Sequence, residues 1–257
     1  MSNILVCGRI KQGKTTLAIF LAHEHSPGVI IWDPRHMQRG YIVEPPIGDN
    51  LEDAIQKKKY RDAPIVIWPG RDIESDFEEV CKVLFDPPER FAGDGKGHGG
   101  FAFVVDEAAD LQTSNSINDS LRVAVKQHPR SVIVIQCTHS LQEWNRSSKD
   151  TMSALYCFRL QGRSLEYVVR YSDVEDEEEF EEALKSLPEH CYVHVDFESR
   201  PGAPAFIICG PLPESAVRKI QEGKKPKFLD ERKEEIEYAP PSRTEDEGER
   251  RRSRDMV

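Results

Sequence analysis

The first thirty residues contain a short apolar run, a glycine-bounded loop and a helical pattern, in that order. The apolar run covers residues 4–7, and Leu17, Phe20 and Leu21 later recur at helical spacing until a Ser-Pro-Gly sequence at 26–28 ends the pattern. The loop between them reads Gly8-Arg9-Ile10-Lys11-Gln12-Gly13-Lys14-Thr15. A strand, a loop of this spacing and a helix form the arrangement in which a backbone wraps around phosphate groups.

This loop predicts a nucleoside triphosphate site that binds ATP with Mg²⁺. The two glycines let the backbone approach phosphate oxygens, and the N–H groups of the loop and the helix start supply positive potential. We expect Lys14 to reach the β- and γ-phosphates as a catalytic group, and Thr15 to offer its hydroxyl to Mg²⁺. The nucleotide-binding set is the loop and the next residue: Gly8, Arg9, Ile10, Lys11, Gln12, Gly13, Lys14, Thr15 and Thr16. A glycine-rich turn without a ligand is the alternative, and the helix that follows disfavours it.

Two adjacent carboxylates follow a second apolar run. Residues 101–105 have the length of a buried parallel strand, and Asp106 and Glu107 come directly after it. Because ligands bind at the carboxyl ends of parallel strands, we expect Asp106 to bind Mg²⁺ and Glu107 to activate the water that attacks the γ-phosphate. The alternative is an acidic helix start that complements the helix dipole.

Gln136 ends a third β-branched run, at residues 131–135. In a parallel sheet this amide would lie beside Asp106, where it can hydrogen-bond the γ-phosphate or the attacking water and sense its presence. A strand-end glutamine that caps a loop is the alternative.

These motifs together resemble the FtsK–HerA superfamily of DNA-pumping P-loop ATPases, over about residues 1–170. Besides the loop, Asp106-Glu107 and Gln136, the resemblance rests on Asp33-Pro34 after an apolar run and on the stretches 127–130, 138–141 and 154–159. The small size looks most like genome-packaging ATPases of membrane-containing viruses and related prophage proteins.

The resemblance implies a homo-oligomeric ring, usually a hexamer, with ATP held between subunits and an arginine supplied by a neighbour. Arg130 is the best positional candidate for this catalytic arginine, with Arg122 and Arg159 behind it. It also implies double-stranded DNA as a partner, with a capsid or membrane-vertex protein as a possible docking site. An ordinary surface salt bridge is the alternative for each arginine.

The pattern of elements predicts an α/β fold, a RecA-like (ASCE) P-loop NTPase with a largely parallel sheet covered by helices on both faces. We expect strands near 3–7, 29–33, 64–68, 101–105, 131–136 and 154–159, then two more near 191–196 and 205–209 that could form a hairpin. Helices are expected at 73–84, 117–125, in the acidic stretch that ends near 187, and at 214–222. We interpret His190, Cys191 and His194 as strand or core residues and not as a metal site.

Composition sets the remaining bounds. At 257 residues the chain can bury one ATPase domain, which we place at 1–222, before a charged tail at 223–257 that we expect to be disordered. The six cysteines lie without paired spacing, and no apolar stretch reaches the length of a membrane span, so we expect a cytoplasmic or virion-associated protein. The net charge of −10 does not exclude DNA, because a few lysines such as those at 57–59 or in the glycine-rich loop 93–100 can face it.

The sequence therefore predicts an Mg²⁺-dependent ATPase that couples hydrolysis to translocation of double-stranded DNA, in viral or prophage genome packaging. The alternatives are a filamentous-phage-type assembly ATPase, a nucleotide kinase or other phosphotransferase, and an ATP-gated partitioning protein.

Overall fold

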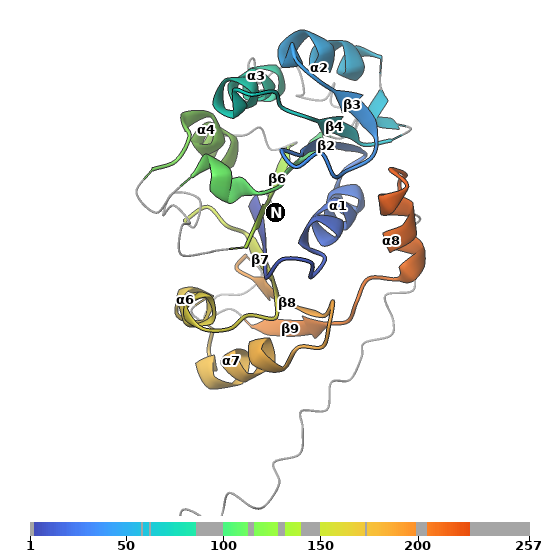
Figure 1. Ribbon diagram of the computed structural model, residues 1–257. Helices are drawn as coiled ribbons and strands as arrows, with labels where there is room; N and C mark the ends of the chain where they lie inside the picture. The colour runs from blue at the N-terminus through green and yellow to red at the C-terminus, as the bar shows by residue number, and fades with distance from the viewer. Residues whose placement is uncertain are drawn as a thin grey trace, which may run out of the picture.

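A mixed sheet of nine strands forms the centre of the computed structural model (Figure 1). The structure describes residues 3–57, 59–61, 63–85, 100–112, 116–127, 132–139, 150–172, 174–198 and 205–226. The strands are β1 (Asn3–Cys7), β2 (Gly28–Trp32), β3 (Tyr41–Val43), β4 (Ile65–Ile67), β5 (Phe101–Val105), β6 (Ile133–Thr138), β7 (Ala154–Phe158), β8 (Tyr192–Asp196) and β9 (Phe206–Cys209). Their order across the sheet is β3-β4-β2-β5-β6-β1-β7-β8-β9.

Neighbouring strands from β3 to β7 all run parallel, whereas β8 is antiparallel to both β7 and β9. Every residue of β1, β2, β5 and β7 is buried, which explains why these strands read as unbroken apolar runs in the sequence. The predicted largely parallel sheet and the antiparallel β8–β9 pair are confirmed.

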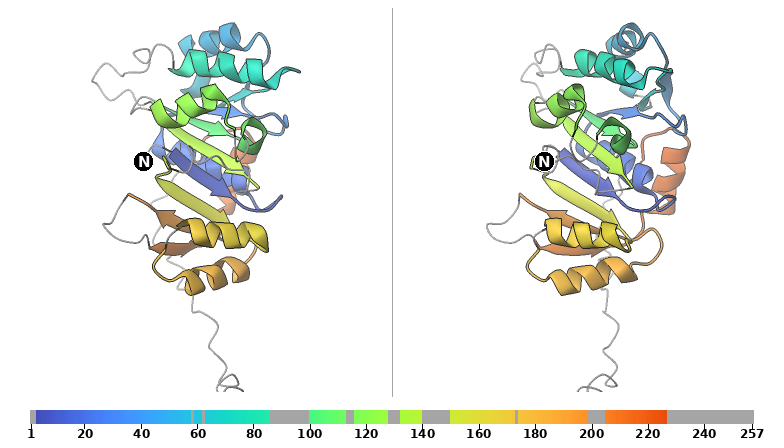
Figure 2. Two further views of the ribbon diagram at one scale, coloured as in Figure 1. Left: turned by 90° about the vertical axis from the view of Figure 1, so that its left-hand side faces the viewer. Right: turned by 60° about the vertical axis from the view of Figure 1, so that its left-hand side comes forward.

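Helices cover both faces of the sheet (Figure 2). They are α1 (Lys14–His25), α2 (Ile47–Gln56), α3 (Ile73–Phe85), α4 (Asp119–Gln127), α6 (Arg163–Ser172), α7 (Glu177–Ser186) and α8 (Glu214–Gln221), with 3₁₀ turns η1 (Lys59–Arg61) and η3 (Ala108–Leu111). The apolar cluster on one face includes side chains of α2, α3, α4, α6 and α7, and the cluster on the other face includes those of α1 and α8. The fold is therefore the α/β arrangement of a P-loop NTPase, as predicted.

Aromatic packing anchors the larger cluster. Phe77 of α3 is fully buried, and its ring packs edge-on against Trp32 of β2 at 5.0 Å between centroids and stacks on Phe103 of β5 at 6.0 Å. These contacts fix α3 across the neighbouring strands β2 and β5. Asp33 directly follows β2, and Asp106, which accepts a hydrogen bond from Thr15, directly follows β5. The apolar core on this face therefore supports the polar groups at the ends of both strands.

The acidic stretch forms the start of α7, as predicted. The side chain of Asp176 accepts a hydrogen bond from the backbone N–H of Glu179 at 2.9 Å, and the first turn carries three more glutamates. These charges therefore satisfy and stabilise a helix start, and they do not line the pocket described below.

Among the described strands and α-helices, three were not predicted: the short strand β3 and the helices α2 and α6. The largest shift in the bounds of a predicted strand is in β6, which spans Ile133–Thr138 where residues 131–136 were expected. Gly223 lies against Arg39, since a Cβ on this glycine would come within 2.8 Å of the Arg39 carbonyl.

The boundary between a domain at 1–222 and a tail stays a prediction, and residues 227–257 lie outside the described part of the chain. Among the helices of that part, none is long and apolar enough to cross a membrane.

Candidate nucleotide-binding site

The loop between β1 and α1 has the backbone conformation that its two glycines permit. Gly8 and Gly13 both have positive φ, at +153° and +98°. A Cβ on Gly8 would lie 2.7 Å from Cβ of Phe158 and 2.8 Å from Oε1 of Gln12. Both conformation and packing therefore require a residue without a side chain at the first loop position.

Replacing Gly8 with alanine is expected to destabilise the protein. The new Cβ would overlap Phe158 and Gln12, which adds about 1–3 kcal/mol of overpacking to the cost of positive φ. Gly162→Ala is the matched control, because Gly162 also has positive φ, at +60°, but nothing lies within 4 Å of its Cβ position. Urea denaturation gives both free energies of unfolding, and equal losses would contradict a packing requirement at Gly8.

The start of α1 is arranged for an anion. Gly13 occupies the N-cap without a side-chain cap, and the first turn contains no acidic residue. The first N–H groups of a helix have no partner within the helix, so here they are left for a ligand. The loop also folds over itself: the backbone N–H of Arg9 donates to Oε1 of Gln12 at 2.6 Å, and Nζ of Lys14 donates to the Arg9 carbonyl at 3.1 Å. The lysine ammonium therefore lies within the loop that would cradle phosphates.

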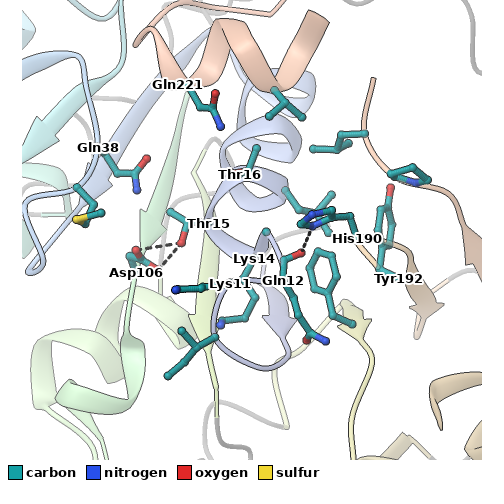
Figure 3. A pocket seen from close by; sticks show the side chains of 18 of the residues that line it. Lys11, Gln12, Lys14, Thr15, Thr16, Gln38, Asp106, His190, Tyr192 and Gln221 are labelled. Carbon is teal, nitrogen blue, oxygen red and sulfur yellow. Dashed lines mark hydrogen bonds between the residues drawn. The ribbon is translucent and has the colours of Figure 1, made fainter. Parts of the chain in front are cut away.

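Asp106 contacts the hydroxyl at the other side of the loop (Figure 3). Oγ1 of Thr15 donates to both carboxylate oxygens of Asp106, at 3.0 and 3.1 Å. Burial raises the pKa of the Asp106 carboxyl to about 6, the hydrogen bond from Thr15 opposes this rise, and the carboxylates of Glu107 and Asp33 add to it. The structure thus brings together the two residues that the sequence assigned to the metal.

The donor set around Asp106 fits Mg²⁺. Asp33 is fully buried at the end of β2, and its Oδ2 accepts the backbone N–H of Gln38 at 2.7 Å, while Oδ1 has no hydrogen-bond partner within the described residues. A hydroxyl, a carboxylate and a further buried oxygen acceptor suit a hard cation that keeps several of its waters. A cation would also favour the ionised form of Asp106 that burial disfavours.

Glu107 lies next to this pair, in a backbone conformation unusual for its type. Its φ and ψ are +49° and +47°, and it precedes η3. Nδ1 of His139 donates to Oε2 of Glu107 at 3.1 Å, and Nη2 of Arg35 lies 4.0 Å from Oε1. Glu107 therefore stands where the loop after β2, the end of β5 and the end of β6 meet.

Gln136 is not brought to the P-loop, which corrects its expected position at a strand end. Because β6 continues to Thr138, Gln136 lies within the strand, opposite Leu5 of β1. Its side chain is fully buried, and Nε2 donates to Oδ1 of Asn3 at 2.9 Å, toward the start of β1. The side chain that reaches Glu107 from the end of β6 is His139.

Neither of the two candidate arginines in the described part of the chain lies at the site. Arg130 lies outside the described residues. Arg122 is exposed on α4, where it pairs with Asp119 at 2.6 Å, and the exposed Arg159 follows β7; neither lines the pocket. Arg35 does line it, directly after the Asp33-Pro34 pair that served only for the resemblance.

The P-loop and Asp106 form one end of a pocket of about 1130 Å³. Further parts of its lining come from residues that no motif marked, one of them beside the P-loop. His190 precedes β8 and donates from Nδ1 to the Gln12 carbonyl at 3.1 Å, so it braces the loop and is not a core residue. The remaining wall comes from Tyr192 and from the segment around α8, namely Pro211, Leu212, Glu214, Ser215, Val217, Arg218 and Gln221 (Figure 3).

The chain has the α/β fold of a P-loop NTPase, with a P-loop and an acidic strand end on one side of its pocket. In the solved structures, the chain resembles the genome-packaging NTPase B204 of Sulfolobus turreted icosahedral virus 2 in complex with AMPPCP, with a TM-score of 0.61, 18% identity, and coverage of 82% of this chain and 98% of that one. The complex of B204 with ATPγS has a TM-score of 0.59 at 16% identity, with the same coverage. The DNA-packaging ATPase B204 of Sulfolobus turreted icosahedral virus has a TM-score of 0.58 at 18% identity, and the match covers 82% of this chain and 98% of B204.

A scan against models of known families found no match, and neither did a search of curated protein sequences. The similarity to the solved B204 structures nevertheless confirms, at the level of the fold, the predicted resemblance to a small genome-packaging P-loop ATPase.

Proposed function

We propose that this protein is an Mg²⁺-dependent ATPase of the FtsK–HerA type that couples ATP hydrolysis to movement of double-stranded DNA, in packaging of a viral or prophage genome. The observation that carries the ATPase part is the bond between Thr15 and Asp106 beside the uncapped start of α1, with Glu107 next to it. The DNA part is supported by the fold shared with B204, which is a DNA-packaging ATPase.

The residues of the pocket divide the work of hydrolysis. The N–H groups of the P-loop and Lys14 bind the β- and γ-phosphates of ATP, and Thr15 and Asp106 hold Mg²⁺. When bound, Mg²⁺ neutralises charge on the phosphate oxygens. Glu107 orients the attacking water and accepts its proton, since it is the carboxylate beside Asp106 that is left free of Thr15.

The end of the pocket near α8 is where the nucleoside belongs in this proposal. The P-loop fixes the phosphates at one end, so the base extends toward Tyr192, Leu212 and Val217. Apolar side chains with a few polar groups are typical of such walls, and Arg218 and Gln221 supply polar groups here.

We further propose that the protein works as a homo-oligomeric ring, a hexamer, with the pocket at the contact between subunits. Ile10 and Met37 line the pocket and each is 74% exposed, and in this proposal a neighbouring subunit covers them. Arg130, Arg122 and Arg159 remain the candidates for an arginine offered to the next subunit. A capsid or membrane-vertex partner, and a place in the host cytoplasm or virion, belong to the same proposal.

The test is steady-state ATP hydrolysis by the purified protein at low salt, with and without long double-stranded DNA. We expect DNA to stimulate hydrolysis, and the stimulation to fall as salt rises, because contacts of lysine and arginine with phosphates release counterions. Single-stranded DNA at equal nucleotide concentration and the Glu107→Gln variant serve as controls.

Other outcomes would assign the protein differently. Hydrolysis that ignores DNA would remove the translocation part and favour an assembly or partitioning ATPase. Turnover that requires a phosphate acceptor other than water would identify a nucleotide kinase and contradict the proposed role of Glu107.

A further inference from the structure

His139 is the nearest described partner of the proposed catalytic carboxylate. Its Nδ1 lies 3.1 Å from Oε2 of Glu107, and since a carboxylate only accepts hydrogen bonds, the imidazole carries the hydrogen on Nδ1. The side chains of Glu107 and His139 are 20% and 42% exposed, so the bond is partly open to solvent and does not lie in the core.

The length of β6 explains why His139 arrives there. β6 lies between β1 and β5, and Gln136 is paired with Val105, the last residue of β5. Two further strand residues carry the chain past this pair, on the side where Asp106 and Glu107 leave β5. His139 therefore emerges at the same edge as Glu107, a position that Gln136 cannot reach from within the strand.

The backbone conformation of Glu107 requires stabilising contacts, and the hydrogen bond from His139 is one of them. The left-handed backbone conformation of Glu107 costs free energy, because a residue with a side chain rarely adopts it. Such conformations persist where contacts with the surrounding structure stabilise them. The second anchor is weak, because Nη2 of Arg35 is 4.0 Å away and the Arg35 side chain is 59% exposed. Among the described residues, His139 therefore makes the closer contact with the carboxylate and fixes its direction more than Arg35 does.

We propose that His139 is a positioning residue for Glu107: its Nδ1–H holds Oε2, which leaves the other carboxylate oxygen directed for the attacking water. This inference rests on the proposed function of Glu107. A base must be held close to its productive geometry, and a displacement of about 1 Å can lower the rate about 100-fold.

The experiment compares His139→Ala with His139→Asn in the full chain, with ATP and long double-stranded DNA present. Alanine removes the donor, and we expect kcat to fall about 10- to 100-fold with KM and the Kd of a fluorescent ATP analogue unchanged. Asparagine places an amide N–H near the position of Nδ1 and is expected to restore most of kcat. In the Glu107→Gln background, His139→Ala should cause no further loss, because it acts through Glu107.

Any other result contradicts the role of His139, and the controls show whether the proposed ATPase function fails with it. A wild-type kcat in His139→Ala, or an equal loss in His139→Asn, would refute positioning by the donor while leaving the ATPase proposal intact. A full further loss in the Glu107→Gln background would give His139 an independent role. A wild-type protein without ATPase activity, or a Glu107→Gln variant with normal activity, would refute the proposed function and this inference with it.

Discussion

Replacing Glu107 with glutamine is expected to stop ATP hydrolysis while ATP binding persists, with kcat lower by about 10²- to 10⁴-fold. Glutamine keeps the shape of the side chain, and its carbonyl can still accept the hydrogen bond from His139. It cannot take a proton from water at neutral pH. Asp106 and Thr15 remain in place, so the groups that hold the phosphates and Mg²⁺ are unchanged.

The measurement pairs kcat with the Kd of a fluorescent ATP analogue. Asp110→Asn is the matched control, since Asp110 is an exposed carboxylate in the 3₁₀ turn directly after Glu107 and does not line the pocket. We expect this control to retain the wild-type kcat. Normal hydrolysis by Glu107→Gln would show that another group activates the water, and equal losses in both variants would point to a general effect of charge.

The sequence could predict the parts of the fold that short-range patterns determine. The P-loop, the strands that end before Asp33 and Asp106, and the acidic start of α7 follow from apolar runs, glycine positions and helix capping. Strand β3 has only three residues, Tyr-Ile-Val, and a strand-forming run this short is not distinguished from a loop by sequence alone. Its pairing with β4 depends on a neighbour more than twenty residues away.

The end of β6 shows why a strand boundary can mislead an assignment. A polar Gln136 after five apolar or small residues resembles a strand end, yet Cys137 and Thr138 are both compatible with a strand, and both are buried. The amide of Gln136 is partly satisfied within the core: Nε2 donates to Asn3, while Oε1 has no hydrogen-bond partner within the described residues. The two-residue difference moved the expected polar contact of Glu107 from Gln136 to His139.

The end of the pocket near α8 could not be predicted, because it joins segments about 200 residues apart in sequence. Leu212, Val217 and Gln221 come to the site only because α8 returns to pack on the face that α1 covers. No local pattern in α8 distinguishes a helix that lines a pocket from one that faces solvent. His190 is similar, since its contact with the Gln12 carbonyl depends on how β8 pairs with β7.

Replacing Lys14 with alanine is expected to abolish productive ATP binding. Lys14 is 9% exposed and lies within the loop, with Nζ bonded to the Arg9 carbonyl. When ATP binds, a charged phosphate would replace the neutral Arg9 carbonyl as the partner of the Lys14 ammonium, in a largely buried site. Removing one member of a buried charge pair of this kind costs about 2–5 kcal/mol of binding free energy. The affinity for ATP should therefore fall by about 30-fold or more.

ATP binding can be measured through the thermal stability of the folded protein. A ligand that binds only the native protein stabilises it by about 2.7 kcal/mol at 100 times its Kd, so ATP with Mg²⁺ should raise the Tm of the wild-type protein and should raise that of Lys14→Ala much less. Lys11→Ala is the matched control: Lys11 is exposed in the same loop, so its removal changes the same net charge and should weaken the stabilisation less. If both variants lost it equally, the loop would attract ATP through its overall charge, and Lys14 would have no special place in binding the phosphates.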